Sequence, residues 1–322
     1  MSLLEIRDLV ISFRFAHQTV QVVSHLDFRI EEAEVFGLVG ESGCGKSLTA
    51  LGIMGILPHN ARAEGRIIFK GNDLLTLEKG AMRALRGREL AMIFQEPMTS
   101  LNPVLTIGYQ VAEVLRTHLG LSRKDAMAQT VELLKAVKIP SPDIRIKEYP
   151  HQMSGGMRQR VMIAMAIACN PSLLIADEPT TALDVTIQAQ ILDLLRNLRK
   201  QRRMAVLLIT HDIGVIAENA ASAAIMYAGR IMEMSRVSGL LTTPKHPYTI
   251  GLLESLPKAK GIPLKPIPGS VPRPHELPPG CRFSNRCLSM IPECEKEEPR
   301  LREITPGHFV RCIRAGDIRW ES

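Results

Sequence analysis

The sequence predicts an α/β fold organised around a phosphate-binding turn, and three stretches of the chain support this prediction. Residues 35–39 form an apolar run with the character of a buried strand, and a glycine-rich turn and an apolar helical segment, residues 48–57, follow it. Two further apolar runs, residues 173–176 and 205–209, also have the character of buried strands and end in polar residues. Strands that alternate with helical segments are typical of α/β proteins.

The turn after the first of these strands is a P-loop. It reads Gly40-Glu41-Ser42-Gly43-Cys44-Gly45-Lys46-Ser47 and matches G-x-x-x-x-G-K-[ST] in the strand–turn–helix context that this pattern requires. We expect the three glycines to adopt positive φ angles, so that successive N–H groups, together with the positive end of the following helix, face phosphate oxygens. Lys46 is expected to reach the β- and γ-phosphates, and the Ser47 hydroxyl to bind Mg²⁺. The alternative is a glycine turn that binds nothing.

Length, composition and charge restrict the class of protein. The 322 residues suit about two domains, and 45% hydrophobic with 23% charged residues is a globular composition. The longest central apolar run, residues 161–169, is shorter than the ~18 residues of a membrane-spanning helix, and the first seven residues do not resemble an export signal. We therefore expect a cytoplasmic protein. The net charge of +7 allows a nucleic-acid or anionic-lipid partner, but no long run of like charges requires one.

The first part of the chain is expected to form an antiparallel layer beside the P-loop strand. Residues 3–15 and 20–30 partly alternate apolar and polar side chains, and Gly71-Asn72 marks a hairpin-type turn after a short strand. Phe13 or Phe15 is a candidate for stacking on a nucleotide base. A phenylalanine in the core of the strand is the alternative interpretation.

The middle of the chain predicts a helical subdomain, which we place at about residues 97–165. Residues 90–94 form another apolar strand that ends at Gln95, and a glutamine there can reach the phosphate end of the site, although most glutamines at strand ends are only solvated. Apolar residues then recur with a helical period up to about residue 139. Ser154-Gly155-Gly156 stands at the start of a further helix, with Ser154 as its N-cap, and forms a second anion-binding helix end. Two such ends require two nucleotides, or one nucleotide shared between two chains.

Polar residues at the ends of the other two strands are candidates for the chemistry. Asp177 is expected to hold Mg²⁺, and Glu178 to orient or deprotonate the attacking water. His211 can contact the γ-phosphate from the end of its strand. The alternatives are a strand that runs into a polar loop and a structural histidine.

The composition changes near residue 240, where a loop-rich segment begins. Most of the 21 prolines lie beyond this point, and proline is rejected from the interiors of helices and sheets. Four of the six cysteines also lie here, with the spacing C-x5-C-x6-C-x17-C: Cys281, Cys287, Cys294 and Cys312. Four thiolates in one compact segment can surround a [4Fe–4S] cluster, bind zinc, or remain without a ligand, although the usual C-x2–4-C spacing of zinc sites is missing.

The motifs taken together resemble those of ABC-type ATPases. The match runs, in order, through the Walker A motif, the Q-loop, the signature, the Walker B motif, the D-loop and the H-loop: Gly40–Ser47, Gln95, Ser154-Gly155-Gly156, Asp177-Glu178, Asp184 and His211. Longer stretches resemble the ATPase subunits of bacterial dipeptide/oligopeptide permeases: Gln95–Pro103, Tyr149–Met157, Ile175–Thr186 and His246–Thr249. The tail that carries the cysteines resembles the C-terminal extension of that subfamily.

The resemblance implies a fold and a domain division. It implies a P-loop NTPase core with an antiparallel β-subdomain, a helical subdomain and a small cysteine-containing C-terminal domain. Residues 1–240 would be the ATPase domain and residues 241–322 the extension.

It also implies a mechanism. Two subunits dimerise head to tail, and ATP lies between the Walker A motif of one and the signature of the other. Gln95 would sense the γ-phosphate and join Ser47 and Asp177 at Mg²⁺, His211 would hold the γ-phosphate and the water, and Asp184 would cross the dimer interface. The resemblance favours an iron–sulfur cluster at the four cysteines.

Two motifs depart from the common pattern of this family. The signature reads Met153-Ser-Gly-Gly-Met157 in place of Leu-Ser-Gly-Gly-Gln, but the Ser-Gly-Gly that touches phosphate is intact, so we expect activity. Cys44 stands where serine is usual. A thiol there raises the hypothesis that the site is sensitive to alkylation.

We therefore expect the ATP-hydrolysing subunit of a di- or oligopeptide importer on the cytoplasmic face of the bacterial inner membrane. Its expected partners are a homologous second ATPase, two membrane permeases and a periplasmic or lipid-anchored binding protein, with no nucleic acid. Import of another solute, such as nickel or glycosides, stays open, as does the choice between homodimer and heterodimer. A soluble ABC ATPase that acts on nucleic acid or ribosomes is the alternative of another class; a single Walker A motif and the lack of sustained heptads argue against it.

Overall fold

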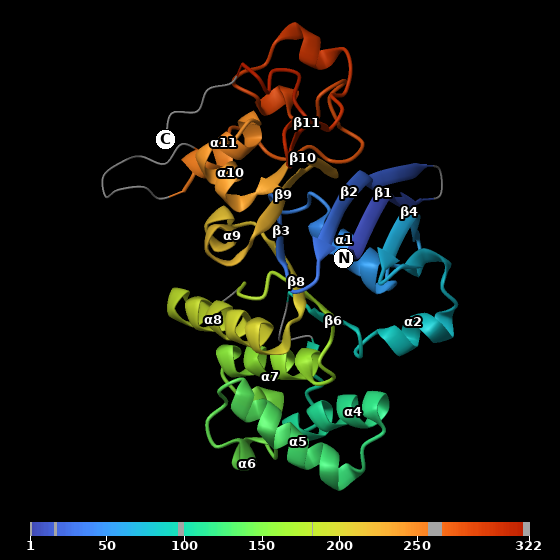
Figure 1. Ribbon diagram of the computed structural model, residues 1–322, viewed down its shortest axis with the longest axis vertical. Coiled ribbons are helices and arrows are strands. Elements are labelled where there is room, and N and C mark those ends of the chain that lie inside the picture. Colours follow the sequence, from blue (N-terminus) through green and yellow to red (C-terminus); the bar gives the residue numbers. More distant parts are fainter. Residues whose placement is uncertain (1, 16–17, 96–99, 182, 257–265, 318–322) are drawn as a thin grey trace. The chain divides into compact units, whose positions relative to one another are not determined.

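The computed structural model describes residues 2–15, 18–95, 100–181, 183–256 and 266–317 (Figure 1). The chain divides into two compact units. We call residues 31–34 and 77–207 the helical unit, and residues 2–30, 35–76 and 208 onward the P-loop unit. Residues 97–99, at the predicted start of the helical subdomain, and Ala182 lie outside the described residues.

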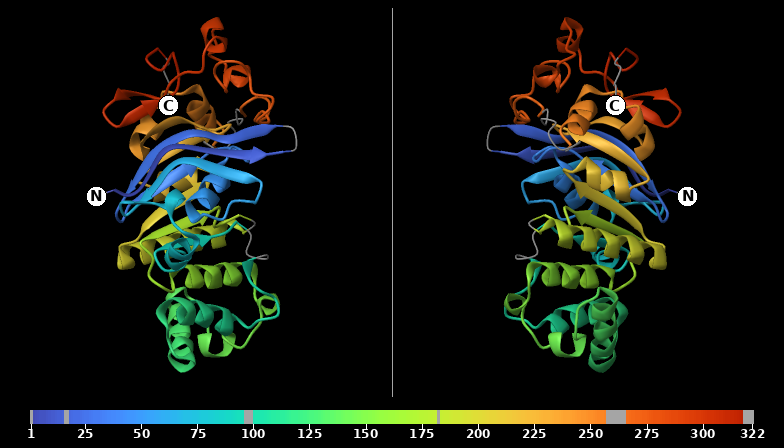
Figure 2. Two further views of the ribbon diagram at one scale, coloured as in Figure 1. Left: turned by 90° about the vertical axis from the view of Figure 1, so that its right-hand side faces the viewer. Right: turned by 90° about the vertical axis from the view of Figure 1, so that its left-hand side faces the viewer.

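The P-loop unit contains the predicted antiparallel layer, a four-stranded sheet. Its strand order is β2 (Thr19–Glu31), β1 (Ser2–Arg14), β4 (Ala61–Phe69) and β5 (Asn72–Asp73). The two long strands β1 and β2 lie side by side in both views of Figure 2. The register of β1 against β4 shifts between Arg7 and Val10. Gly65 of β4 lies opposite this shift, and a side chain is excluded there because a Cβ would lie 2.3 Å from the Asp8 carbonyl oxygen.

A second sheet in the P-loop unit carries the P-loop. Its strand order is β11 (Arg302–Thr305), β12 (His308–Val310), β10 (Arg230–Arg236), β9 (Ser222–Tyr227) and β3 (Val35–Val39). β3 pairs with β9 in parallel, and the other pairs are antiparallel. The helices of this unit are α1 (Lys46–Met54), α9 (Ile213–Asn219), α10 (Val237–Thr242) and α11 (Pro247–Glu254). The sequence did not predict β11 and β12, because strands this short in a proline-rich segment show no alternation.

The helical unit combines a pair of parallel strands with a group of helices. The strands are β6 (Leu90–Ile93) and β7 (Leu173–Asp177), and β8 (Ala205–Thr210) begins in this unit and ends in the other. The helices are α2 (Lys79–Leu85), α4 (Ile107–Leu119), α5 (Arg123–Ala136), α6 (Pro142–Arg145), α7 (Gly155–Ile167) and α8 (Val185–Arg202). α4, α5 and α7 pack on one another.

Local signals explain where these helices start and stop. The Thr106 and Ser122 hydroxyls cap α4 and α5 by accepting bonds from the N–H groups of Tyr109 and Asp125. α4 ends at Gly120, whose φ of 67° is left-handed. In the described part of the chain, no helix combines the length and the apolar character needed to cross a bilayer.

Candidate active site

The P-loop has the strand–turn–helix geometry that the sequence predicts, with one difference. Gly43 and Gly45 have φ angles of 80° and 106°, and Gly45 is the N-cap of α1. Gly40 does not adopt a positive φ, which corrects our expectation for all three glycines. Glycine is needed at position 40 for a different reason: a Cβ there would lie 2.1 Å from the Met226 carbonyl oxygen of β9.

Lys46 and Ser47 occupy the first turn of α1, where the predicted phosphate contacts need them. The Lys46 ammonium is buried and donates to the carbonyl oxygens of Gly40, at 2.6 Å, and Glu41, at 3.0 Å. Ser47 is half-buried. The loop therefore holds its cation among its own carbonyls, at the positive end of a helix, which is a favourable place for an anion.

Cys44 is fully buried, and this argues against the alkylation hypothesis. The side chain has no exposed surface, and its sulfur lies 3.8 Å from Lys46 Nζ. Burial raises the pKa of the Cys44 thiol, and the nearby Lys46 charge offsets this rise only in part. A buried thiol that stays protonated is a poor nucleophile, so we now expect Cys44 to behave as a small packing residue.

Two residues of the C-terminal segment, which we take as residues 241 onward, contact Glu41, the second residue of the P-loop. The Arg286 guanidinium donates to both carboxylate oxygens, and the Glu41 N–H donates to the Tyr248 hydroxyl. Sequence reasoning missed both partners, because they lie 245 and 207 positions away and no local pattern links them to the loop.

Two further candidates lie in the P-loop unit. His211 is exposed directly after β8, and Asp212 behind it caps α9 by accepting a bond from Gly214 N–H at 2.7 Å. Phe13 is half-buried near the end of β1 and stacks on the exposed Phe15, with 6.4 Å between ring centroids. An aromatic pair with one open ring suits base stacking, and the role of Phe13 stays a prediction.

In the helical unit the strand register brings Gln95 and Glu178 together. Ile93 of β6 is paired with Ala176 of β7, and each candidate lies two residues further along its strand. Because the strands are parallel, both side chains emerge at the same edge of the sheet, and Gln95 Nε2 donates to a Glu178 carboxylate oxygen at 3.2 Å. The sequence predicted both residues as candidates for the site, but it did not predict the contact between them.

The Glu178 backbone is in an uncommon conformation. Its φ of 45° is left-handed, which is unfavourable for a residue with a Cβ, and such strain gathers at functional sites. Thr181 Oγ1 donates to the Glu178 carboxylate at 2.8 Å. The preceding Asp177 is buried, 3% exposed, at the end of β7. The strand thus presents one buried and one half-buried carboxylate in succession.

The helices that begin at the signature and at the D-loop residue, α7 and α8, pack on each other within the helical unit. Ser154 caps α7 by accepting a bond from Met157 N–H at 3.3 Å, and both Ser154 and Gly155 are exposed. Asp184 caps α8 by accepting a bond from Ile187 N–H at 2.9 Å. A Cβ built on Gly156 would lie only 2.9 Å from Ile187 Cγ2, so the start of α7 packs tightly on the start of α8.

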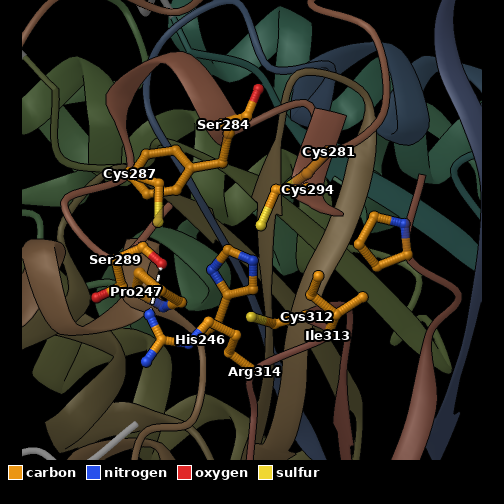
Figure 3. A pocket seen from close by; sticks show the side chains of 12 residues that line it. His246, Pro247, Cys281, Ser284, Cys287, Ser289, Cys294, Cys312, Ile313 and Arg314 are labelled. Atoms are coloured by element: carbon orange, nitrogen blue, oxygen red, sulfur yellow. Dashed lines mark hydrogen bonds between the residues drawn. The ribbon is translucent and has the colours of Figure 1, made fainter. Parts of the chain in front are cut away.

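The four C-terminal cysteines line a single cavity in the P-loop unit (Figure 3). Other residues that line it are His246, Pro247, Phe283, Ser284, Ser289, Pro299, Ile313 and Arg314. Arg314 donates to the Ser289 carbonyl oxygen at 2.9 Å. Burial raises the pKa of Cys281, Cys287 and Cys312 to about 11, so without a bound cation these thiols stay protonated at neutral pH.

Within the described residues, no three side chains of histidine, cysteine, aspartate or glutamate are arranged to hold one metal ion. The cysteine cavity thus does not have the close tetrahedral arrangement of a preformed zinc site. All six cysteines are free thiols.

Comparisons with known proteins relate this geometry to a family. A family model described as ABC transporter matches residues 23–181, and one described as oligopeptide/dipeptide transporter, C-terminal region, matches residues 232–294. The dipeptide transport ATP-binding protein DppD of Haemophilus influenzae is 49% identical over 315 residues, which cover 97% of this chain and 95% of that protein. DppD of Bacillus subtilis is 47% identical over 313 residues, covering 96% and 93%. The dimeric structure of MJ0796, a bacterial ABC transporter cassette, superposes with a TM-score of 0.65 at 25% identity, covering 73% of this chain and 98% of that one.

Proposed function

Because this chain belongs to the ABC transporter family, as an ATP-binding subunit, we propose that it powers the import of dipeptides or oligopeptides across the bacterial inner membrane. The match of its C-terminal part to the oligopeptide/dipeptide transporter region carries this proposal, because that region is not part of the ATPase cassette itself. Relatives of nearly full length are named as dipeptide transport proteins, which supports the same substrate class.

The proposed chemistry assigns a role to each candidate residue. The N–H groups of the P-loop and the Lys46 ammonium bind the phosphates of ATP. Ser47, Asp177 and Gln95 carry oxygen atoms of the kind that Mg²⁺ prefers and, from the motifs to which they belong, would be its ligands. The ion would neutralise charge on the phosphates. Glu178 takes a proton from the attacking water, and His211 holds the water and the γ-phosphate.

The proposed assembly contains two ATPase subunits, two membrane permeases and a substrate-binding protein. The signature, Ser154-Gly155-Gly156, with its first two residues exposed, is a second anion-binding helix end, and a partner subunit's nucleotide gives it a ligand. We infer that the partner is a homologous ATPase and that the chain is peripheral, on the cytoplasmic side of the membrane. Ser154 and Asp184 then face the partner.

Affinity purification of the tagged chain from gently solubilised membranes tests this function. We expect two polytopic membrane proteins and a second P-loop chain to copurify, and the purified complex to hydrolyse ATP faster when its binding protein carries a dipeptide. Copurification of ribosomal proteins or DNA without a membrane partner would overturn the proposal. A complex stimulated by nickel or a glycoside, and not by peptides, would correct the substrate alone.

We further propose that the four-cysteine cavity holds a [4Fe–4S] cluster. Two observations support the fit: all four cysteines line one cavity, and none is used in a disulfide. A cluster does not require the four sulfur atoms to converge on one metal ion, because each thiolate binds a different iron atom. The segment has little regular structure, so a bound cluster would contribute much of its order.

Iron and sulfide analysis of protein purified without oxygen tests the cluster. We expect equal amounts of iron and sulfide together with a broad visible absorbance, and both should be lost in Cys281→Ser and Cys312→Ser. Cys169→Ser is the control, because Cys169 is a half-buried free thiol outside this segment. Protein without iron, or with zinc in its place, would reject the cluster and leave the ATPase function unaffected.

A further inference from the structure

The C-terminal segment contacts the P-loop through a partly buried ion pair. Arg286 Nη1 and Nη2 lie 3.0 and 3.1 Å from the two Glu41 carboxylate oxygens, which is a bidentate arrangement. The Arg286 side chain is only 4% exposed, and the Glu41 side chain 30%. Arg286 also donates to the Pro268 carbonyl oxygen at 2.6 Å, so the guanidinium is held from both sides.

A tyrosine from α11 holds the backbone at the same residue. The Tyr248 hydroxyl accepts a bond from the Glu41 N–H at 3.1 Å, and Tyr248 is fully buried. Tyr227 of β9 completes the cluster, because its hydroxyl lies 3.4 Å from Arg286 Nη1 and its ring lies under the guanidinium. Side chain and main chain of Glu41 are therefore both fixed by residues from outside the loop.

These contacts compensate a negative charge in the P-loop. Glu41 places a carboxylate in a turn whose function is to bind the phosphates of ATP, and like charges repel strongly where water is partly excluded. Arg286 compensates this charge from the side of the C-terminal segment. Without it, the turn that binds the triphosphate would carry an uncompensated negative charge.

The same short segment lines the cysteine cavity. Arg286 directly precedes Cys287, and Phe283 packs edge-on against Tyr227 and at a tilt against Tyr248, with 5.2 Å between ring centroids in both pairs. His246, which lines the cavity, caps the helix that carries Tyr248. Order at the cavity and the position of Glu41 therefore depend on the same residues.

We propose that Arg286 and Tyr248 are positioning residues of the P-loop, through which the C-terminal segment sets the affinity of this chain for ATP. The inference rests on the proposed function in that the P-loop binds ATP. It adds that the segment, which contributes none of the family's nucleotide-binding motifs, is coupled to nucleotide binding. Since such coupling is reciprocal, bound nucleotide should also stabilise the segment.

Arg286→Met and Arg311→Met form a matched pair that tests this proposal. Both arginines are buried in the C-terminal segment and directly precede a cysteine, but Arg311 donates to the carbonyl oxygens of Ile231 and Pro299 and not to the P-loop. In fluorescence titrations of the full chain with an ATP analogue, we expect Arg286→Met to bind roughly ten-fold more weakly, within the usual range for coupled sites. Arg311→Met should bind like wild type. Equal affinities in the two variants would overturn the proposal.

A rescue separates positioning from a general loss of folding. Adding Glu41→Gln to Arg286→Met removes the uncompensated charge, so affinity should return to within about two- to three-fold of wild type. Tyr248→Phe removes one hydroxyl only and should weaken binding by a similar two- to three-fold. If Glu41→Gln does not restore binding in a variant that melts as wild type does, the electrostatic argument is wrong.

Hydrogen exchange supplies a readout that does not depend on affinity. Nucleotide at saturating concentration should slow exchange in the peptides around residues 281–290 of wild type and of Arg311→Met, and not in Arg286→Met. Wild-type protein that binds no nucleotide would reject the proposed function itself. Wild-type protein that binds nucleotide without this protection would reject only the coupling.

Discussion

At the scale of single residues, Glu178 has the geometry of a positioned general base. Gln95 and Thr181 both donate to its carboxylate, and its left-handed backbone holds it at the end of β7. A carboxylate that accepts two bonds keeps one orientation, which a general base requires. We predict that Glu178→Gln still binds ATP but hydrolyses it at least ~10²-fold more slowly, the usual scale for loss of a general base. Steady-state phosphate release and nucleotide titration measure the two quantities.

The control for this variant is Asp193→Asn, which removes a carboxylate from the same unit. Asp193 lies on the surface of α8 and pairs with Arg196 at 2.8 Å, with a side-chain exposure of 60%. Surface ion pairs of this kind contribute little to the stability of a protein, so the turnover of Asp193→Asn should equal that of wild type. Near-normal turnover in Glu178→Gln would show that another group deprotonates the water.

At the scale of elements, two adjacent glycines at the start of α7 differ in the space around them. A Cβ on Gly155 would lie 3.6 Å from Leu183 Cδ2, an ordinary contact, whereas one on Gly156 would lie 2.9 Å from Ile187 Cγ2. Alanine favours helix over glycine by about 1 kcal/mol at either position. We predict that Gly156→Ala is less stable than Gly155→Ala by about 1–3 kcal/mol, the usual cost of overpacking.

Chemical denaturation of the two glycine variants measures this difference. Ile187→Ala removes the atom in conflict, so it should make the cost of Gly156→Ala disappear in the double variant. Equal stability of Gly155→Ala and Gly156→Ala would mean that α8 moves away from α7 at no cost.

The N-cap of α11 gives the fold a dependence on pH. His246 Nδ1 accepts a bond from the Tyr248 N–H at 3.0 Å, and burial lowers the pKa of His246 to about 4, although the nearby Glu233 opposes this. In the unfolded chain the pKa of histidine is about 6.5, so the unfolded state takes up the proton first. The contribution of His246 is complete above pH ~6.5 and is lost as the pH falls toward about 4. The resulting decrease in the free energy of unfolding approaches about 3 kcal/mol.

His246→Asn keeps a capping oxygen and removes the titration. We predict that its free energy of unfolding falls less steeply than that of wild type between pH 6.5 and 4, in urea titrations at several pH values. The control is His59→Asn, because His59 is exposed. Parallel pH profiles for wild type and His246→Asn would contradict the prediction.

At the scale of the whole molecule, the sequence predicted those features that depend on local patterns. The P-loop, the N-cap serine at position 154 and the apolar strand before Asp177 each lie within a few residues of the signal that predicts them. The contacts of Gln95 with Glu178 and of Glu41 with Arg286 were not predictable, because they depend on strand register and on a segment more than 200 positions away. The prediction of a positive φ angle for Gly40 was wrong for the same reason, because the strand that crowds this residue, β9, is distant from it in the sequence.

The last prediction concerns the assembly of two chains. Ser154 is exposed at the start of α7, and it is not one of the residues that the proposed chemistry assigns to the nucleotide held by this chain's own P-loop. Ser154→Arg in the Glu178→Gln background should bind ATP as its parent does. It should fail to form the ATP-dependent dimer, because a bulky side chain occupies the helix end that meets the partner's phosphate.

Light scattering during size-exclusion chromatography, with ATP and with the second ATPase chain added, measures this dimer. The control is Ser122→Arg, because Ser122 is also an N-cap serine of the helical unit but lies outside the signature. Its dimer should match that of the parent, because a lost cap alone costs only about 1 kcal/mol. A dimer of normal size and stability in Ser154→Arg would show that the signature of this chain stays outside the interface, and its partner would then have to supply both nucleotide contacts.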